Sequence, residues 1–251
     1  GKVLEILARK AAQGVDVRVM YDGTCEFTNL PRDYPQRLAK LNISCKVFSP
    51  LTPFVSTHYN YRDHRKIVVI DGKVAYTGGM NVADYYIKGT PQVGEWHDMH
   101  CRIEGTEVNT LQDIFLRMWN KVTHHNIHGP QYYRGLGDAS YFHGLKPDTC
   151  RTAGHKMVGI VNREPHTSNR IIRDFYTHAI SMAQDSIKLI NPYFTLNRSI
   201  KRALRKAVKR GVKVEIMLSV RSDIPLTPDC GFYNAHKLMK RGCSVWMYKP
   251  G

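Results

Sequence analysis

The chain has 251 residues, of which 42% are hydrophobic and 10% aromatic, a composition that supports a buried core and excludes a disordered chain. Lysine and arginine outnumber aspartate and glutamate by 37 to 21, and the resulting net charge of +16 favours a phosphate-rich partner or an anionic membrane surface. The sequence predicts no membrane-spanning helix, since no apolar run reaches about 18 residues, and it lacks the P-loop, the dinucleotide-binding glycine motif and the G-x-S-x-G serine motif.

A predicted helix and the buried strand after it occur twice, in the first residues and again about 200 residues later. Residues 7–20 align without a gap with residues 204–217, and both segments show apolar residues at helical spacing, then a glycine, then a strand of alternating valines. The likeness continues from Leu38 and from Leu238, where a short helical end precedes a second strand. Two α/β halves are the simplest explanation of this repeat.

Residues 64–81, HRKIVVIDGKVAYTGGMN, contain a predicted β-hairpin. Residues 66–70 form the first strand, Asp71-Gly72 is the signal of a type I′ turn, and residues 73–77 form the returning strand. A two-residue turn would pair Ile70 with Lys73, Lys66 with Thr77 and His64 with Gly79.

The start of this hairpin combines residue types that suit phosphoryl transfer. His64 and Lys66 share one face because side chains alternate along a strand. Gly78 and Gly79 leave room for a substrate, and Asn81 brings amide donors for a phosphate oxygen. The pattern predicts a metal-free site in which an unprotonated imidazole attacks phosphorus while the lysine and the asparagine neutralise the developing charge.

The rest of the first half is predicted to contain a strand over residues 98–104 and an amphipathic helix over residues 108–122. The helix should turn its apolar side chains inward: Leu111, Ile114, Phe115, Met118 and Trp119. We expect a first half at 1–123, a Gly-, His- and Tyr-rich connector at 124–154 and a second half at 155–251. Three connector histidines (His124, His125 and His128) leave a metal site open as an alternative to a plain linker.

The second half begins with a predicted strand over residues 186–190, followed by a basic helix over residues 198–213. The basic helix contains no acidic residue and eight basic ones: Arg198, Lys201, Arg202, Arg205, Lys206, Lys209, Arg210 and Lys213. Two interpretations are open, a solvated face or a surface that docks on anionic lipid headgroups.

The full spacing H-x-K-x4-D-x6-G-G-x-N, from His64 to Asn81, resembles the HKD motif of the phospholipase D superfamily. Four further segments resemble its bacterial cardiolipin synthase branch: residues 60–66, 94–98, 191–194 and 248–251. The resemblance implies an α/β, phospholipase D-like fold with two pseudo-twofold-related halves, each a mixed β-sheet flanked by helices, with the second half truncated.

The resemblance also implies roles for the motif residues. His64 would be the nucleophile that forms a phosphatidyl-histidine intermediate, with Lys66 assisting and Asp71 supporting the local hydrogen bonds. Lys66 and Asn81, together with Gly78 and Gly79, would bind the substrate phosphate. No metal and no cofactor would be needed.

The implied reaction transfers a phosphatidyl group between two phosphatidylglycerol molecules and yields cardiolipin and glycerol. The implied location is the bacterial cell membrane, reached through anchoring helices absent from this chain, with the catalytic part on the cytoplasmic side. A second HKD motif is expected near position 264, about 200 residues after His64, so the 251 residues alone should be inactive. Two alternatives are a phospholipase D family nuclease that binds nucleic acid, and an inactive fragment that binds anionic phosphate surfaces.

Overall fold

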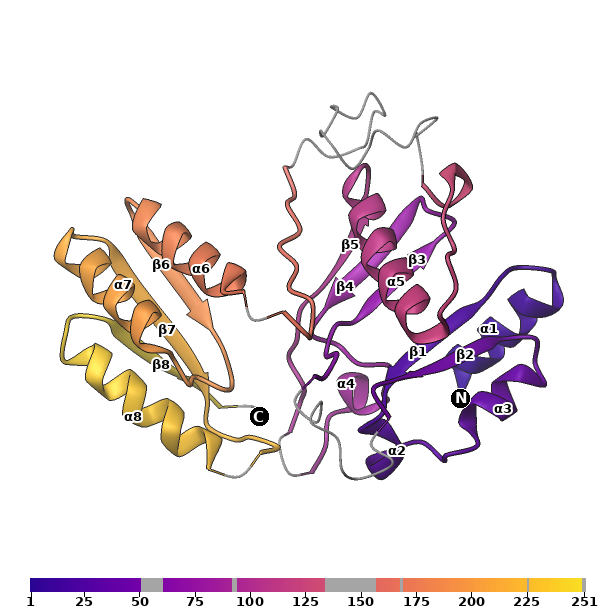
Figure 1. Ribbon diagram of the computed structural model, residues 1–251. Coiled ribbons are helices and arrows are strands. Elements are labelled where there is room, and N and C mark those ends of the chain that lie inside the picture. Colours follow the sequence, from indigo (N-terminus) through magenta and orange to yellow (C-terminus); the bar gives the residue numbers. More distant parts are fainter. Residues whose placement is uncertain (51–60, 92–93, 134–156, 168, 225, 250–251) are drawn as a thin grey trace. The chain divides into compact units, whose positions relative to one another are not determined.

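The computed structural model describes residues 1–50, 61–91, 94–133, 157–167, 169–224 and 226–249. The chain forms two compact units (Figure 1), and each is described by itself. Unit 1 comprises Gly1–Val82 and Met99–Ile160, and unit 2 comprises Ala83–Asp98 and Val161–Gly251. Most of the predicted connector, from residue 134 to residue 154, lies outside the described residues, and the predicted domain boundaries stay a prediction.

Unit 1 starts with a parallel pair of strands and the helices that precede them. These elements are α1 (Lys2–Ala12), β1 (Arg18–Asp22), α2 (Cys25–Thr28), α3 (Tyr34–Ala39) and β2 (Ser44–Phe48). The two strands pair in parallel from Arg18 opposite Ser44 to Asp22 opposite Phe48. Ala11, Leu38 and Ile43 are buried between the helices and this sheet, so a small apolar cluster holds the pair together.

The second part of unit 1 is a three-stranded antiparallel sheet with one long helix packed on it. It consists of β3 (Ile67–Ile70), β4 (Val74–Gly78), β5 (His100–Glu104) and α5 (Glu107–Thr123), followed by the 3-10 turn η1 (Pro130–Tyr132). Ala75 and Ile103 from the sheet are buried against Val108, Leu111 and Ile114 of α5. The predicted inward face of this helix is confirmed for four of its five residues, while Phe115 stays partly exposed.

The β3–β4 hairpin is confirmed, but its predicted register was wrong by one residue. Ile70 pairs with Val74 rather than with Lys73, and Ile67 pairs with Thr77. Asp71 and Gly72 both have positive φ (54° and 60°), and the turn closes through a 3.0 Å hydrogen bond from the Lys73 N–H to the Ile70 carbonyl. The turn is therefore of the expected kind, and the difference arises because Lys73 is left out of the strand pairing.

Unit 2 is built on a three-stranded parallel sheet in the order β6-β7-β8. Its elements are α4 (Tyr85–Lys88), α6 (Ile171–Met182), β6 (Ser186–Ile190), α7 (Arg198–Lys209), β7 (Lys213–Ser219), α8 (Thr227–Met239) and β8 (Ser244–Tyr248). The alternating residues Val214, Ile216 and Leu218 of β7 are buried in one cluster with Leu204 of α7 and Leu238 of α8. Both helices therefore cover the same face of the sheet.

The sequence repeat corresponds to a repeated helix–strand–helix–strand unit with equivalent turns. Gly14 and Gly211 have φ of 87° and 92° after the first helix of each copy. After the second helix, Asn42 and Gly242 also have positive φ. In both of these turns the next residue donates to the carbonyl of the helical leucine, at 3.1 Å in the first copy and 3.2 Å in the second. The predicted internal repeat is therefore confirmed in backbone detail.

The predicted basic helix ends earlier than expected. The helix α7 stops at Lys209, Arg210 caps it, and Lys213 is already the first residue of β7. The reason is Gly211, whose positive φ stops the helix before the strand begins. Six of the eight basic residues thus lie on the helix itself.

The fold class is the predicted one, a mixed α/β structure with parallel and antiparallel sheets. The described helices contain none long and apolar enough to cross a membrane.

Candidate active site

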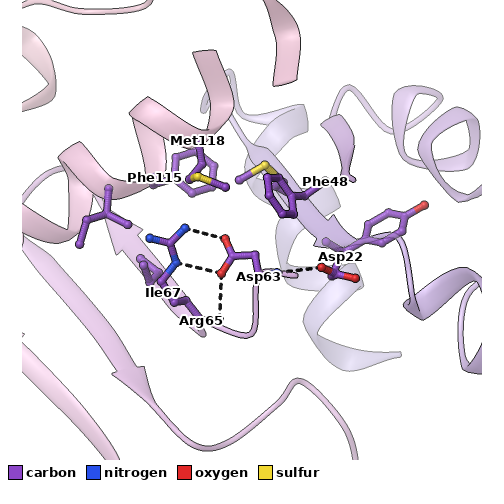
Figure 2. A pocket seen from close by; sticks show the side chains of 10 residues that line it. Asp22, Phe48, Asp63, Arg65, Ile67, Phe115 and Met118 are labelled. Carbon is purple, nitrogen blue, oxygen red and sulfur yellow. Dashed lines mark hydrogen bonds and ion pairs between the residues drawn. The ribbon is translucent and has the colours of Figure 1, made fainter. Parts of the chain in front are cut away.

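The segment that leads into β3 is held against α5 by alternate side chains. Asp63, Arg65 and Ile67 line a cavity of about 90 Å³ that also touches Phe115 and Met118 of α5 (Figure 2). Ligand pockets usually measure about 300–1,000 Å³, so this cavity is too small for a phospholipid headgroup. It marks the packed side of the segment.

His64 and Lys66 alternate in the sequence with these cavity-lining residues, in the irregular backbone just before β3. The Nζ of Lys66 donates a 2.7 Å hydrogen bond to the backbone carbonyl oxygen of His64. His64 is exposed and Lys66 is partly exposed. The structure thus places the ammonium of Lys66 against the backbone of His64, at a position that solvent reaches.

Asp22, the last residue of β1, ties this segment to the parallel sheet of unit 1. Its Oδ2 accepts a 2.8 Å hydrogen bond from the backbone N–H of Asp63 (Figure 2), next to His64. Its Oδ1 accepts from the N–H and the hydroxyl of Thr24, at 2.9 and 2.8 Å, and from Arg62 Nη1 at 3.2 Å. Only 8% of the Asp22 side chain is exposed. The carboxylate is therefore a nearly buried anchor with four donors.

Two further interactions fix the residues on either side of His64. Arg62 donates from Nη1 to the carbonyl of Ser49 and from Nη2 to its hydroxyl, both at 2.8 Å. Arg65 donates from Nε and Nη2 to the two carboxylate oxygens of Asp63, at 2.8 and 2.9 Å (Figure 2). Two-point contacts of this kind set orientation as well as attraction, so the backbone of His64 is fixed from both sides.

The surroundings of His64 lower the pKa of its imidazole. Partial burial has the largest effect, and the positive charge of Lys66 adds to it; the carboxylates of Asp22 and Asp63 act in the opposite direction. An imidazole with a lowered pKa is largely neutral at pH 7, and a neutral imidazole is the nucleophilic form.

Cys25 lies near this charged group, which the sequence did not indicate. Burial raises the pKa of its thiol, the charge of Asp22 raises it further, and Lys66 opposes both. The thiol therefore stays protonated at neutral pH, and Cys25 does not compete with His64 as a nucleophile.

Gly78 is the last residue of β4, and Gly79 and Asn81 follow it, at the end of the hairpin where His64 and Lys66 precede β3. The register that pairs Ile67 with Thr77 brings Gly78 level with Lys66, and the N–H of Gly79 donates to the Met99 carbonyl at 2.9 Å. Asn81 is exposed three residues beyond the strand. These positions agree with a common site at this end of the hairpin.

Asp71 lies in the turn at the opposite end of β3. It lies five positions after Lys66 along extended chain, which corresponds to roughly 16 Å. The structure therefore does not bring Asp71 together with His64. Its positive φ helps to form the turn between β3 and β4. Asp71 can therefore support the site only by stabilising the hairpin.

Gly78 also has a structural requirement of its own. A Cβ atom at this position would lie 2.6 Å from the Cα of His100 and close to the carbonyl of Met99, both backbone atoms of unit 1. We expect Gly78→Ala to lower the free energy of unfolding by about 1–3 kcal/mol, since overpacking typically costs that much. Urea unfolding measures this, with Gly159→Ala as the control because a Cβ there meets nothing within 4 Å. Equal stability of the two variants would contradict the prediction.

Asp22, Arg62 and Asp63 are parts of the site that were not predicted from the sequence. One signal was present, because a polar side chain directly after a parallel strand stands at the edge where ligands bind in α/β sheets. Within the described residues, no group of three or more His, Cys, Asp or Glu side chains is arranged to hold a metal ion. His124 ends α5 in a left-handed conformation, and the Nδ1 of His128 lies 2.8 Å from the Asn126 carbonyl.

Comparison with known families gives a match over most of the chain. The family described as "Cardiolipin synthase, PLD-like domain" matches residues 1–119 and 176–251. Among solved structures, the phosphatidylserine synthase of Haemophilus influenzae superposes with a TM-score of 0.61 at 12% identity, over 98% of this chain and 63% of that one. At this identity the superposition shows a shared fold.

Several curated proteins are similar over the whole chain. An uncharacterized protein of Streptococcus mutans is 36% identical over 253 residues, a cardiolipin synthase of Halalkalibacterium halodurans 33% over 251, and the major cardiolipin synthase of Bacillus subtilis 33% over 252. Each alignment covers 100% of this chain but 52%, 47% and 49% of the relative. The chain thus spans about half the length of the curated relatives that it matches.

Proposed function

The chain belongs to the family of phospholipase D-like cardiolipin synthase domains, and from this premise we propose that it is the part of a phosphatidyltransferase that carries the nucleophile. The proposed reaction joins two phosphatidylglycerol molecules into cardiolipin and releases glycerol. The observation that carries the proposal is that Lys66 donates to the backbone carbonyl of His64 and that desolvation first, and the charge of Lys66 second, lower the pKa of the imidazole.

The reaction proceeds in two steps that exchange one bond at phosphorus for another. In the first step, the neutral imidazole of His64 attacks the phosphorus; a nitrogen–phosphorus bond forms, and the bond to the headgroup glycerol oxygen breaks. The leaving oxygen takes a proton from an acid. In the second step, a hydroxyl of another phosphatidylglycerol gives its proton to the conjugate base of that acid and attacks the same phosphorus, and the nitrogen–phosphorus bond breaks, which returns the neutral imidazole and the protonated acid.

The remaining motif residues act on the phosphate. Lys66 and Asn81 offset the negative charge that builds up on the non-bridging oxygens in each step. The N–H groups and open space at Gly78 and Gly79 let the phosphate approach His64. Asp71 contributes only by keeping the hairpin turn in place. Neither a metal ion nor an organic cofactor enters these steps.

A second half-site supplies the acid in this proposal. The relatives are about twice as long as the chain, which supports a partner motif near position 264 if the repeat of about 200 residues continues. The 251 residues alone are then expected to be inactive in transfer. Membrane anchoring helices outside these residues, with the catalytic part on the cytoplasmic side of a bacterial membrane, belong to the same proposal.

The test is product analysis by mass spectrometry. A protein that carries this chain and continues to the length of its relatives is incubated with phosphatidylglycerol vesicles, beside the 251 residues alone. We expect cardiolipin and glycerol in equal amounts from the longer protein and neither product from the shorter one. Phosphatidic acid as the main product would show that the protein hydrolyses phosphatidylglycerol instead of transferring the phosphatidyl group. Cleavage of labelled DNA without any lipid product would favour the nuclease alternative, to which the net charge of +16 also corresponds.

A further inference from the structure

The solvent side of α7 carries a stripe of positive charge. Arg198, Arg202, Lys206 and Lys209 are exposed on the side opposite the buried Leu204 and Ala207. Lys201 and Arg205 lie beside them and are partly exposed. The helix contains no aspartate or glutamate to offset them. Like charges at this spacing repel one another, so the stripe carries a cost that an anionic partner would relieve.

Two of the eight basic residues expected on this helix serve the fold instead. Arg210 donates from Nη2 to the carbonyls of Ile180 and Ala183, at 3.0 and 3.2 Å, and so caps the end of α6. Lys213 forms a 3.2 Å ion pair with Glu215 within β7. Neither belongs to the stripe.

The helix α8 extends the stripe. Lys237 Nζ lies 2.5 Å from the hydroxyl of Tyr233 and 4.1 Å from its ring centre. Hydrogen bonding to Lys237 lowers the pKa of this phenol, and the charge of Lys201 on α7 lowers it further. The cations of both helices therefore act on the same exposed side chain. We call the six basic residues of α7 together with Lys237 the basic face: Arg198, Lys201, Arg202, Arg205, Lys206, Lys209 and Lys237.

Exposed apolar side chains occur at the start of α8 and on its surface. Leu226, the residue before α8, is 74% exposed, Ile224 is 47% exposed, and Tyr233 is 61% exposed. A basic helical surface with exposed aliphatic and aromatic side chains is typical of proteins that lie on an anionic bilayer. A polyanion without an apolar layer, such as DNA, offers nothing for the aliphatic side chains to enter.

We propose that the basic face docks unit 2 on an anionic phospholipid bilayer, with Ile224 and Leu226 entering the interface between headgroups and acyl chains. The docking involves none of the residues of the His64 site. It therefore extends beyond the proposed reaction, and the two are tested by separate measurements.

The test is vesicle co-sedimentation of the 251-residue chain. The variant Arg198→Glu/Lys201→Glu/Arg202→Glu keeps α7 helical, because glutamate is favourable in the first turns of a helix. We expect it to bind vesicles of phosphatidylglycerol in phosphatidylcholine at least about tenfold more weakly than the original chain. The matched control, Lys2→Glu/Arg32→Glu/Lys40→Glu, makes the same charge change at exposed positions of unit 1, and we expect it to retain most of the binding.

A second variant separates lipid from nucleic acid as the partner. Ile224→Ser/Leu226→Ser should weaken binding to the same vesicles severalfold and leave binding to a DNA duplex unchanged. Circular dichroism verifies that each variant is folded. The proposal is overturned if both charge-reversed variants lose binding equally, if neither loses any, or if the serine variant binds vesicles as the original chain does. Loss of DNA binding alone in the α7 variant would assign the face to nucleic acid instead.

Discussion

Replacement of His64 by alanine is expected to lower the rate of phosphatidyl transfer at least about a thousandfold, because a covalent mechanism loses its nucleophile. Stability should change little, since the side chain is exposed and its neighbours are held through the backbone and through Asp22, Arg62 and Arg65. The measurement is the initial rate of cardiolipin formation in the longer protein. His178→Ala, which removes an exposed histidine on α6, serves as the control. Full activity of the His64 variant would exclude the proposed mechanism.

The pH dependence of the same reaction tests the state of the imidazole. The pKa of His64 is lowered from the ordinary value of 6.5 by partial burial and by Lys66, so the neutral, nucleophilic form persists to lower pH than in a free histidine. As the pH falls through the lowered pKa, the imidazole takes up a proton and kcat/KM decreases. We expect the midpoint of this acid limb below 6.5. A midpoint above that value would contradict the lowered pKa.

The parts of the fold that could be predicted from the sequence are those written in local patterns. The glycine after each first helix, Gly14 and Gly211, has the positive φ that a helix end favours. The inward side of α5 follows from its spacing alone, as four buried residues confirm. The predicted register of the hairpin was wrong because Asp71-Gly72 indicates only the type of turn. It does not indicate whether strand pairing resumes directly after the turn. Leaving Lys73 unpaired shifts every later pair by one residue.

The site shows the same division. The assignment of His64 and Lys66 to one face stays a prediction from alternation along a strand, because both residues precede β3. The anchoring role of Asp22 could not be predicted, because Asp22 lies 41 positions before Asp63 in the sequence. No spacing rule relates the end of β1 to the start of β3. Gly78 was predicted to make room for a substrate, yet the backbone of Met99 and His100 requires a glycine there in any case. Residues near a reacting group can thus be constrained by the fold alone.

Asp22 is expected to be a positioning residue, with effects on rate that exceed its effects on folding. Asp22→Ala removes the acceptor for the Asp63 N–H and for Arg62, so the backbone of His64 gains freedom. A displacement of about 1 Å at a nucleophile can cost about a hundredfold in rate, which is the loss that we expect in kcat. The free energy of unfolding should fall by about 3 kcal/mol, at the low end for a broken buried ion pair, because Arg62 keeps 22% of its side chain exposed.

The variant Asp22→Asn distinguishes an effect on His64 from a loss of stability. It keeps the size of the side chain and removes its negative charge, and that charge raises the pKa of His64. Removal of the charge lowers this pKa further, so the acid limb of kcat/KM must move to lower pH. Asp16→Asn is the matched control, because Asp16 pairs with Arg18 in the same unit and is 59% exposed. A variant that only loosened the fold would lower the rate at every pH and leave the midpoint where it was; a shift in Asp22→Asn alone therefore requires the carboxylate to act on the imidazole.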